Sequence, residues 1–114
     1  MTTKQLATRM IALCAKKKFN EARHELFSTD VISMEADNKK MKGLKALKKK
    51  HDQWISSMEK IHGLKISKPL INGNFFSVAY TWDVTYKGQA RSGWKEIGVY
   101  EVKEGKVVFE KYFY

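Results

Sequence analysis

Hydrophobic residues recur at helical spacing in the first part of the chain. The apolar stripe that begins the sequence consists of Leu6, Met10, Leu13 and Cys14. Because positions three and four apart share one face of a helix, this stripe predicts a helix over about residues 3–17. Thr2 and Gln5 stand at the spacing of a capping box, which would begin that helix. The spacing continues after Asn20, a favourable N-cap residue, and predicts a short second helix over about residues 20–27.

The hydrophobic period then changes from helical to alternating. Residues 31–37 alternate between two faces, one of which carries Ile32, Met34 and Ala36. This period of two predicts a strand. From residue 42 to 61 the apolar residues return to helical spacing, which predicts a long third helix. That helix is expected to end at His62-Gly63, where glycine can adopt the left-handed C-cap conformation.

Turn signals divide the remainder of the chain into strands. Asn72-Gly73, Lys87-Gly88 and Glu104-Gly105 favour tight turns, and Asn72-Gly73 fits a type I′ hairpin. Pro69 has no N–H to donate and points to an edge or a bulge. Helices followed by a meander of long strands predict an α+β fold with a strongly curved antiparallel sheet. The predicted strands cover residues 64–71, 74–86, 90–103 and 106–114.

Length and composition agree with a single domain over residues 1–114. Hydrophobic residues make up 43% of the chain, which is enough for a core, and no apolar run approaches the roughly 18 residues that a membrane span needs. We therefore expect no membrane partner. The single cysteine, Cys14, excludes an internal disulfide and fits a reducing compartment, so a cytoplasmic location is expected.

The chain is strongly basic, with 22 Lys and Arg against 12 Asp and Glu and a formal net charge of +10. A basic surface attracts polyanions, so polyanion binding is one alternative function. Only three of the basic residues are Arg, however, and bidentate recognition of phosphates and bases favours Arg. Seven lysines fall between Lys39 and Lys50, and those at 45, 48 and 49 lie off the apolar stripe, as on a solvated helix face. Nucleic acid is therefore a disfavoured partner.

One face of each long strand combines bulky aromatic rings with polar groups. Glu96 shares its face with Trp94 and Tyr100, and the last strand carries Val108, Glu110, Tyr112 and Tyr114 on one face. Apolar walls with a few polar groups are typical of a ligand pocket, and burial raises the pKa of such carboxyl groups toward useful acid–base values. The alternative is that these acids are solvated and the rings only cover the sheet. The predicted pocket wall comprises Trp54, Tyr80, Trp82, Trp94, Tyr100, Glu110, Tyr112 and Tyr114.

The three histidines differ in their expected surroundings. His51 lies within the apolar stripe of the long helix, beside Trp54, and is predicted to face inward, either as a hydrogen-bonded core residue or as a pocket group. His24 and His62 are interpreted as structural residues. Because the histidines lack ligand-like spacing and Cys14 is expected to be a buried, inert thiol, neither a metal nor another cofactor is expected.

Three sequence segments carry a resemblance to a known family. They are the segment from Leu26 to Glu35, the Lys42-Gly43-Leu44 entry to the long helix, and Glu96-Ile97-Gly98-Val99-Tyr100 leading to Gly105-Lys106-Val107-Val108. With the order of elements, they resemble the SnoaL-like branch of the nuclear-transport-factor-2-like (NTF2-like) superfamily over essentially the whole chain. The resemblance implies an NTF2-like cone, in which three N-terminal helices pack on a strongly curved antiparallel sheet around a pocket. Members include ketosteroid isomerases, polyketide cyclases and dehydratases.

The resemblance also implies roles for individual residues. Alignment on Leu26-Phe27 puts Glu35 at the position of the isomerase general base, with Asp37 as a ligand-binding residue further along the same strand face. The oxyanion positions of the isomerases fall near Ile11, which cannot donate a hydrogen bond, and near Gly98. The sequence therefore departs from the isomerases. The cyclases use a sparser set of acids and histidines, which this chain would supply with Glu35, His51 and Glu96.

The combined expectation is a small-molecule pocket protein for a small apolar or carbonyl-containing ligand. In an isomerisation, cyclisation or dehydration, Glu35 would act as base, with His51 and Glu96 as proton donors or orienting groups. The alternatives are a non-catalytic ligand-binding or dimerisation module and, less favoured, a polyanion-binding protein. A homodimer is expected from the resemblance, through exposed aromatic residues of the sheet such as Phe75, Phe109 and Phe113.

Overall fold

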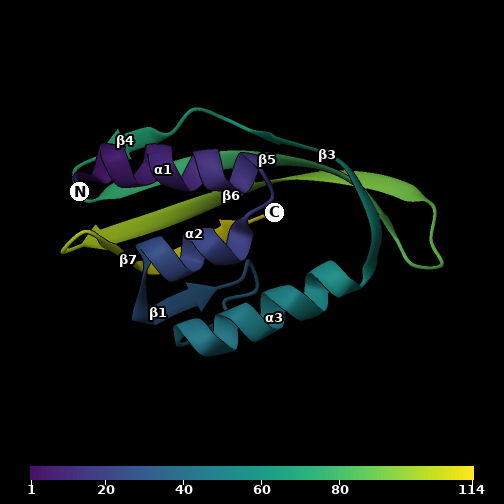
Figure 1. Ribbon diagram of the computed structural model, residues 1–114, viewed down its shortest axis with the longest axis horizontal. Coiled ribbons are helices and arrows are strands. Elements are labelled where there is room, and N and C mark those ends of the chain that lie inside the picture. The colour runs from purple at the N-terminus through teal and green to yellow at the C-terminus, as the bar shows by residue number, and fades with distance from the viewer.

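The computed structural model describes all of residues 1–114 and confirms the α+β fold class (Figure 1). No helix is long and apolar enough to cross a membrane. The three helices are α1 (Thr3–Ala15), α2 (Phe19–Leu26) and α3 (Leu44–Ser56). The strands are β1 (Phe27–Met34), β2 (Lys40–Lys42), β3 (Met58–Ile66), β4 (Leu70–Asn72), β5 (Phe75–Tyr86), β6 (Arg91–Lys103) and β7 (Lys106–Phe113).

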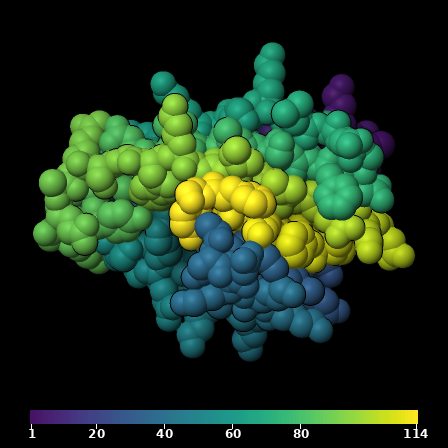
Figure 2. Space-filling model, turned by 180° about the vertical axis from the view of Figure 1, so that it is seen from behind, coloured from purple at the N-terminus to yellow at the C-terminus, as the bar shows by residue number.

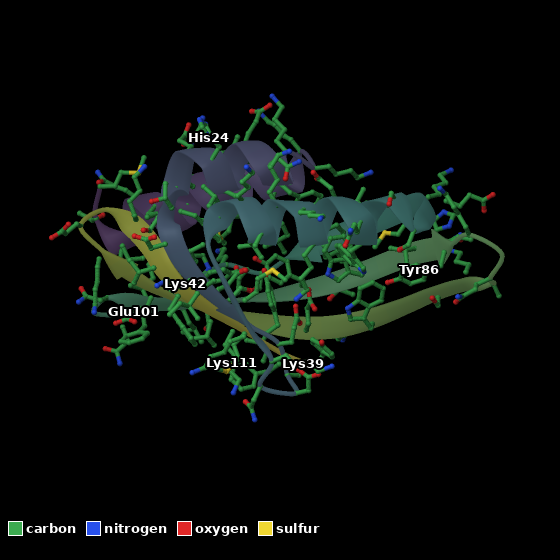
Figure 3. All side chains as sticks on the ribbon, turned by 90° about the horizontal axis from the view of Figure 1, so that it is seen from below. His24, Lys39, Lys42, Tyr86, Glu101 and Lys111 are labelled. Carbon is green, nitrogen blue, oxygen red and sulfur yellow. The ribbon has the colours of Figure 1, made fainter.

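One sheet joins the strands in the order β2-β1-β7-β6-β5-β3, and β4 also pairs with β5. Neighbouring strands are antiparallel except β1 and β7, which run parallel. This parallel pair brings the C-terminal strand, yellow in Figure 2, beside the segment that follows α2, blue in the same view. The long strands β5, β6 and β7 form the body of the sheet, and the helices lie together on one of its faces (Figure 3).

The start of α1 follows the predicted capping box. The backbone N–H of Gln5 donates to Oγ1 of Thr2 at 3.1 Å, and the backbone N–H of Thr2 donates to Oε1 of Gln5 at 2.9 Å. The N-cap predicted for the second helix is wrong, because α2 has Lys18 at its N-cap and no side-chain cap. Asn20 lies inside α2 instead, where its Nδ2 donates to Oδ1 of Asp52 at 2.9 Å and ties α2 to α3.

The long helix expected over residues 42–61 is shorter in the structure. Helix α3 ends at Ser56, and the next residues form β3, which pairs with β5. Apolar residues such as Ile61 fit both a helical stripe and a strand, and pairing with the long β5 decides between the two. His62-Gly63 therefore lies inside β3 rather than at a helix C-terminus, and His62 Nε2 lies 2.7 Å from Thr85 Oγ1.

The first strand begins and ends earlier than predicted. Strand β1 covers Phe27–Met34 rather than residues 31–37, because its parallel pairing with β7 begins at Phe27. Glu35 therefore follows the strand directly, while Asp37 lies in the turn before β2. The short strand β2 was not predicted from the sequence.

The turns at Asn72-Gly73 and Glu104-Gly105 differ in backbone conformation. Asn72 pairs with Phe75, so the central residues of the first turn are Gly73 and Asn74, and of these only Gly73 has a positive φ, 58°. The type I′ assignment to Asn72-Gly73 is thus wrong, although the turn is present. At Glu104-Gly105 both residues have positive φ, 52° and 74°, as a type I′ turn requires. Pro69 lies in the break between β3 and β4, which had been expected to form one strand.

A bulge in β7 corrects the face expected for its first residues. Val102 pairs with Val107 and Glu101 pairs with Phe109, so Val108 has no partner of its own. As a result Val107, and not Val108, is fully buried in the core. From Glu110 onward the alternation follows the sequence prediction.

Candidate functional site

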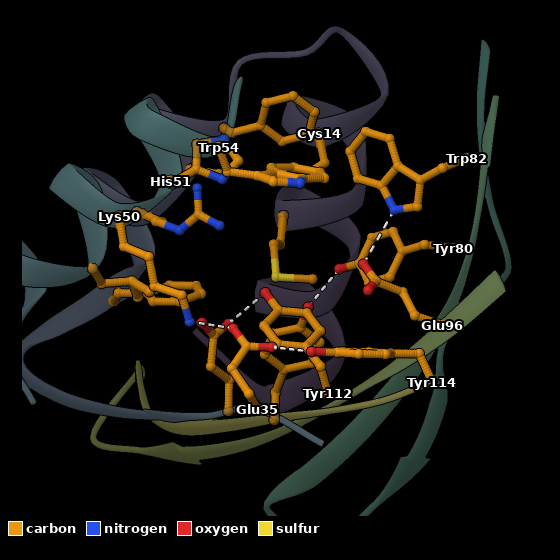
Figure 4. Close-up of a pocket in the computed structure, with 18 of the residues that line it drawn as sticks. Cys14, Glu35, Lys50, His51, Trp54, Tyr80, Trp82, Glu96, Tyr112 and Tyr114 are labelled. Atoms are coloured by element: carbon orange, nitrogen blue, oxygen red, sulfur yellow. Dashed lines mark hydrogen bonds and ion pairs between the residues drawn. The ribbon is translucent and has the colours of Figure 1, made fainter. Parts of the chain in front are cut away.

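A cavity of about 570 Å³ lies between the concave face of the sheet and the helices (Figure 4). Of the 20 residues that line it, 14 are hydrophobic, and its size is typical of small-molecule sites. Trp82 and Trp94 stack with ring centroids 5.8 Å apart, and Trp54 from α3 meets Trp82 edge-on at 5.0 Å. All three tryptophans of the chain therefore line one cavity.

The structure places eleven of the twelve predicted site residues around this cavity. The exception is Asp37, which is exposed and whose Oδ1 accepts a hydrogen bond from the backbone N–H of Lys39 at 3.0 Å. Asp37 lies outside because β1 ends before it, so the alternation that would have directed it inward stops. The residues brought together are Glu35, His51, Trp54, Tyr80, Trp82, Trp94, Glu96, Tyr100, Glu110, Tyr112 and Tyr114.

Glu35 lies between a helix and the C-terminal residue at one side of the cavity. Its carboxylate forms an ion pair with Nζ of Lys50 on α3 and accepts a hydrogen bond from the hydroxyl of Tyr114 at 3.0 Å (Figure 4). The side chain of Glu35 is 25% exposed. The carboxylate is thus positioned from two sides and is still accessible, as a group that exchanges protons with a bound molecule must be.

Glu96 projects from β6 into the same cavity. The indole N–H of Trp82 donates to its Oε1 at 3.1 Å. Burial among the rings raises the pKa of Glu96, because desolvation disfavours the charged carboxylate. Glu96 is therefore a desolvated carboxyl group with a raised pKa, whereas Glu35 is held in an ion pair.

Glu110 on β7 is fully buried and has both carboxyl oxygens in hydrogen bonds. Its Oε1 accepts from the hydroxyl of Ser33 at 2.9 Å, and its Oε2 accepts from the hydroxyl of Tyr112 at 3.0 Å. Burial raises the pKa of Glu110 in the same way. The contact with Ser33 links β1 and β7 across their parallel pairing, whereas Tyr112 lies on β7 itself.

His51 lines the cavity from α3 and packs against Phe19 and Trp54, with ring centroids 5.1 Å and 5.6 Å away. Burial, with the nearby positive charge of Arg23, lowers the pKa of His51 to about 3. The ring is therefore neutral near pH 7 and is not a cationic proton donor there. Its Nε2 is buried without a hydrogen-bond partner, unlike that of a satisfied core histidine.

Comparison with known proteins identifies the family. The sequence matches the SnoaL-like domain over residues 1–114. The chain belongs to the SnoaL-like family. No curated protein matches it.

Solved structures of the same superfamily share the fold of this SnoaL-like domain. One is a candidate SnoaL-like polyketide cyclase [carbohydrate phosphatase] from Mesorhizobium loti, with 29% identity, 100% coverage of both chains and a TM-score of 0.93. An NTF2-like protein from Burkholderia thailandensis E264 has 13% identity over 99% of this chain and 90% of that chain, with a TM-score of 0.84. A candidate SnoaL-like polyketide cyclase from Jannaschia sp. CCS1 has 9% identity over 96% of this chain and 85% of that chain, with a TM-score of 0.82. The last two likenesses show the fold alone.

Neither Ile11 nor Gly98, the positions to which the resemblance assigned the isomerase oxyanion hole, carries a side-chain donor in this SnoaL-like domain. Ile11 packs against the hydrophobic core. Gly98 leaves room for a ring, since a Cβ there would lie 2.6 Å from the hydroxyl oxygen of Tyr100. That hydroxyl shares a hydrogen bond with the hydroxyl of Tyr80, and burial raises the pKa of both groups. The cavity therefore presents a pair of neutral tyrosine hydroxyls at this place.

Two charged residues of the SnoaL-like cavity, Arg23 and Lys50, were not predicted. Lys50 had been counted in the lysine-rich segment without a role, yet it lies three residues after Leu47 and four before Trp54, on the apolar stripe, so the spacing could have found it. Arg23 lies four residues after Phe19 on a short and mostly polar helix. The same spacing puts Arg23 on the face of Phe19 and Leu26, but a helix of eight residues with five polar ones gives only a weak signal.

Proposed function

We propose that this SnoaL-like domain binds a small, planar carbonyl compound and moves a proton from a carbon atom beside the carbonyl. The observation that carries the proposal is the contrast between two carboxyl groups at one aromatic cavity. Glu35 is ion-paired with Lys50, whereas Glu96 is desolvated and its pKa is raised. Carboxyl groups whose environments differ in this way can serve as base and acid in one reaction. The name of the similar Mesorhizobium loti protein, a candidate polyketide cyclase, belongs to the same class of chemistry.

The proposed proton transfers use only the carboxyl groups of Glu35 and Glu96. The carboxylate of Glu35 takes a proton from the carbon beside the carbonyl, and the electron pair of the broken C–H bond forms an enolate. Glu96, as the neutral acid, donates its proton to the enolate oxygen, which gives an enol. Return of the proton from Glu35 to a different carbon, while the enol O–H proton goes back to Glu96, completes an isomerisation. In a cyclisation the enol carbon instead attacks a second carbonyl, the enol O–H proton goes back to Glu96, and Glu35 gives its proton to the new alkoxide. His51, held neutral, orients the ligand.

The direct test is hydrogen–deuterium exchange at the carbon beside the carbonyl of 2-tetralone, followed by proton NMR in D2O. The wild-type chain should accelerate the exchange over buffer. Glu35→Gln should slow the protein-catalysed rate by about a hundredfold or more, because general-base catalysis typically contributes 10²–10⁴. Glu96→Gln should slow it less, since the amide can still donate a hydrogen bond but not a proton.

Glu101→Gln is the matched control, because Glu101 lies on β6 but does not line the cavity. It should leave the exchange rate unchanged. Exchange by Glu35→Gln at the wild-type rate would contradict the role assigned to Glu35. All variants are checked by circular dichroism for an unchanged fold.

A second candidate function is non-catalytic ligand binding in the same cavity. It is favoured by one observation, that both oxygens of Glu35 are already engaged by Lys50 and Tyr114. It predicts that 2-tetralone binds to the wild-type chain without acceleration of exchange. That outcome would replace the catalytic proposal.

We further propose that two copies of the chain pair through the outer face of the sheet. Phe75, Ile97 and Phe113 are 48%, 47% and 46% exposed there, and Ile97 lies directly opposite Phe113. Phe109 on the same face is partly buried. An apolar face of this kind is typical of an interface. Light scattering should show a dimer for the wild-type chain and a monomer for Ile97→Lys. The control Lys49→Ala, on α3, should leave the mass unchanged. A wild-type monomer at high concentration would contradict the pairing.

A further inference from the structure

Arg23 is the charged side chain of the cavity that lacks a partner. Its Nε and Nη1 are fully buried without a hydrogen bond, and it takes part in none of the ion pairs. Lys50, the other cation of the cavity wall, is paired with Glu35. A buried cation without a counter-ion is strongly unfavourable, so a fold that keeps one has a reason to do so.

Glu110 acts on Arg23 through its charge but forms no ion pair with it. Both carboxyl oxygens of Glu110 already accept hydrogen bonds, from Ser33 and from Tyr112. The guanidinium therefore keeps buried N–H donors without acceptors at the wall of the cavity.

His51 is a second side chain from the helices that has a buried nitrogen without a hydrogen-bond partner. It comes from α3, whereas Arg23 comes from α2, and each lines the cavity and has a buried nitrogen without a partner. The positive charge of Arg23 contributes to holding His51 neutral, so the two groups together present one charge and not two. One negatively charged oxygen group would satisfy that charge.

We propose that the ligand of this cavity carries a carboxylate that pairs with Arg23, so the substrate class is a planar carbonyl compound that also bears an acid group, rather than a neutral ketone. This inference rests on the proposed function, in which the cavity binds a planar molecule. A guanidinium offers a planar fork of donors that matches a carboxylate. A carboxylate held there would leave the body of the ligand among the rings of Trp54 and Trp82, in a cavity large enough for two or three fused rings.

The test compares 2-naphthoate with its neutral isostere 2-naphthamide by isothermal titration calorimetry at pH 7. The wild-type chain should bind the acid about ten- to hundredfold more tightly than the amide, as expected for charge-assisted hydrogen bonds. Arg23→Met should remove this preference and leave the affinity for the amide unchanged. Arg23→Lys should keep part of the preference for the acid, because the positive charge stays while the paired donors of the guanidinium are lost.

Arg9→Met is the matched control, since Arg9 is an exposed residue of α1 paired with Glu25 outside the cavity. It should keep the full preference for the acid. Equal binding of acid and amide by the wild-type chain overturns the inference and leaves the proposed pocket function standing. An Arg23→Met variant that weakens both probes equally also overturns it, because Arg23 would then only support the fold.

Two further outcomes are decisive. If neither probe binds at millimolar concentration, the pocket function is contradicted and the inference with it. If Arg23→Met does not fold by circular dichroism, the comparison of acid and amide on the wild-type chain and on Arg23→Lys decides the question.

Discussion

The sheet side and the helix side of the cavity differ in how their polar groups are satisfied. On the sheet side, Glu110 accepts hydrogen bonds from Ser33 and Tyr112, and the tyrosine hydroxyls of β5 and β6 bond to each other. On the helix side, Arg23 and His51 have buried nitrogens without partners. The sheet side is thus complete within the protein, whereas the helix side keeps buried nitrogens that the proposed ligand would satisfy. The difference assigns stability of the fold to the sheet side and, under our proposal, ligand recognition to the helix side.

The largest effect on stability is expected for Glu110→Ala. The change leaves the hydroxyls of Ser33 and Tyr112 without their acceptor and opens a void, so the free energy of unfolding should fall by about 3 kcal/mol. Urea unfolding of the variant and of the wild-type chain measures this difference in free energy. Glu101→Ala, on β6 outside the cavity, is the control and should cost less than about 0.5 kcal/mol. A similar small loss for both variants would break the contrast between the two sides.

A smaller loss is expected for Gly98→Ala, also on the sheet side. The new Cβ would lie 2.6 Å from the hydroxyl oxygen of Tyr100, and the buried ring has little room to move. Overpacking of this kind typically costs about 1–3 kcal/mol. Gly63→Ala on β3 meets no atom within 4 Å and should be nearly neutral by the same urea assay. Equal stability of the two variants would show that Tyr100 is not fixed by the sheet.

The helix side should respond to pH through His51. Its pKa is near 6.5 when unfolded and about 3 when folded, so the unfolded chain binds more protons between these values. Stability is therefore lost as pH falls below 6.5, by about 1.4 kcal/mol at pH 5.5 relative to pH 8. The raised pKa values of Glu96 and Glu110 act in the opposite direction, because the folded state then binds more protons.

Unfolding of His51→Phe at both pH values isolates the histidine from the two acids. His51→Phe should lack the part of the fall in unfolding free energy that His51 causes as pH is lowered. The effects of Glu96 and Glu110 on the pH dependence should remain. Identical pH dependence in the two proteins would show that His51 is not buried in its neutral form.

Local sequence pattern predicts the parts of the fold that neighbouring residues decide. The capping box of α1 and the turn at Glu104-Gly105 are decided by neighbouring residues, and both are present. The boundary after α3 was misplaced because Ile61 fits two periods, and only the pairing of β3 with β5 decides between them. The bulge at Val108 is likewise a property of two paired strands and leaves no signal in one of them.

For the site, alternation along the strands placed Glu96 and Glu110 on the inner face, since one strand face is a local property. Asp37 was misplaced because the strand ends three residues before it. Arg23 was missed because an arginine on a short polar helix is normally solvated, and its position at the cavity depends on how α2 packs against the sheet.

The most direct test of ligand binding in the cavity uses the indole N–H signals of Trp54, Trp82 and Trp94, which are the only three indoles of the chain and all line it. In a nitrogen–proton NMR titration with 2-naphthoate and, separately, with 2-tetralone, we expect at least one ligand to shift all three signals in a saturable way. Signals that stay in place with both ligands at millimolar concentration would contradict the account.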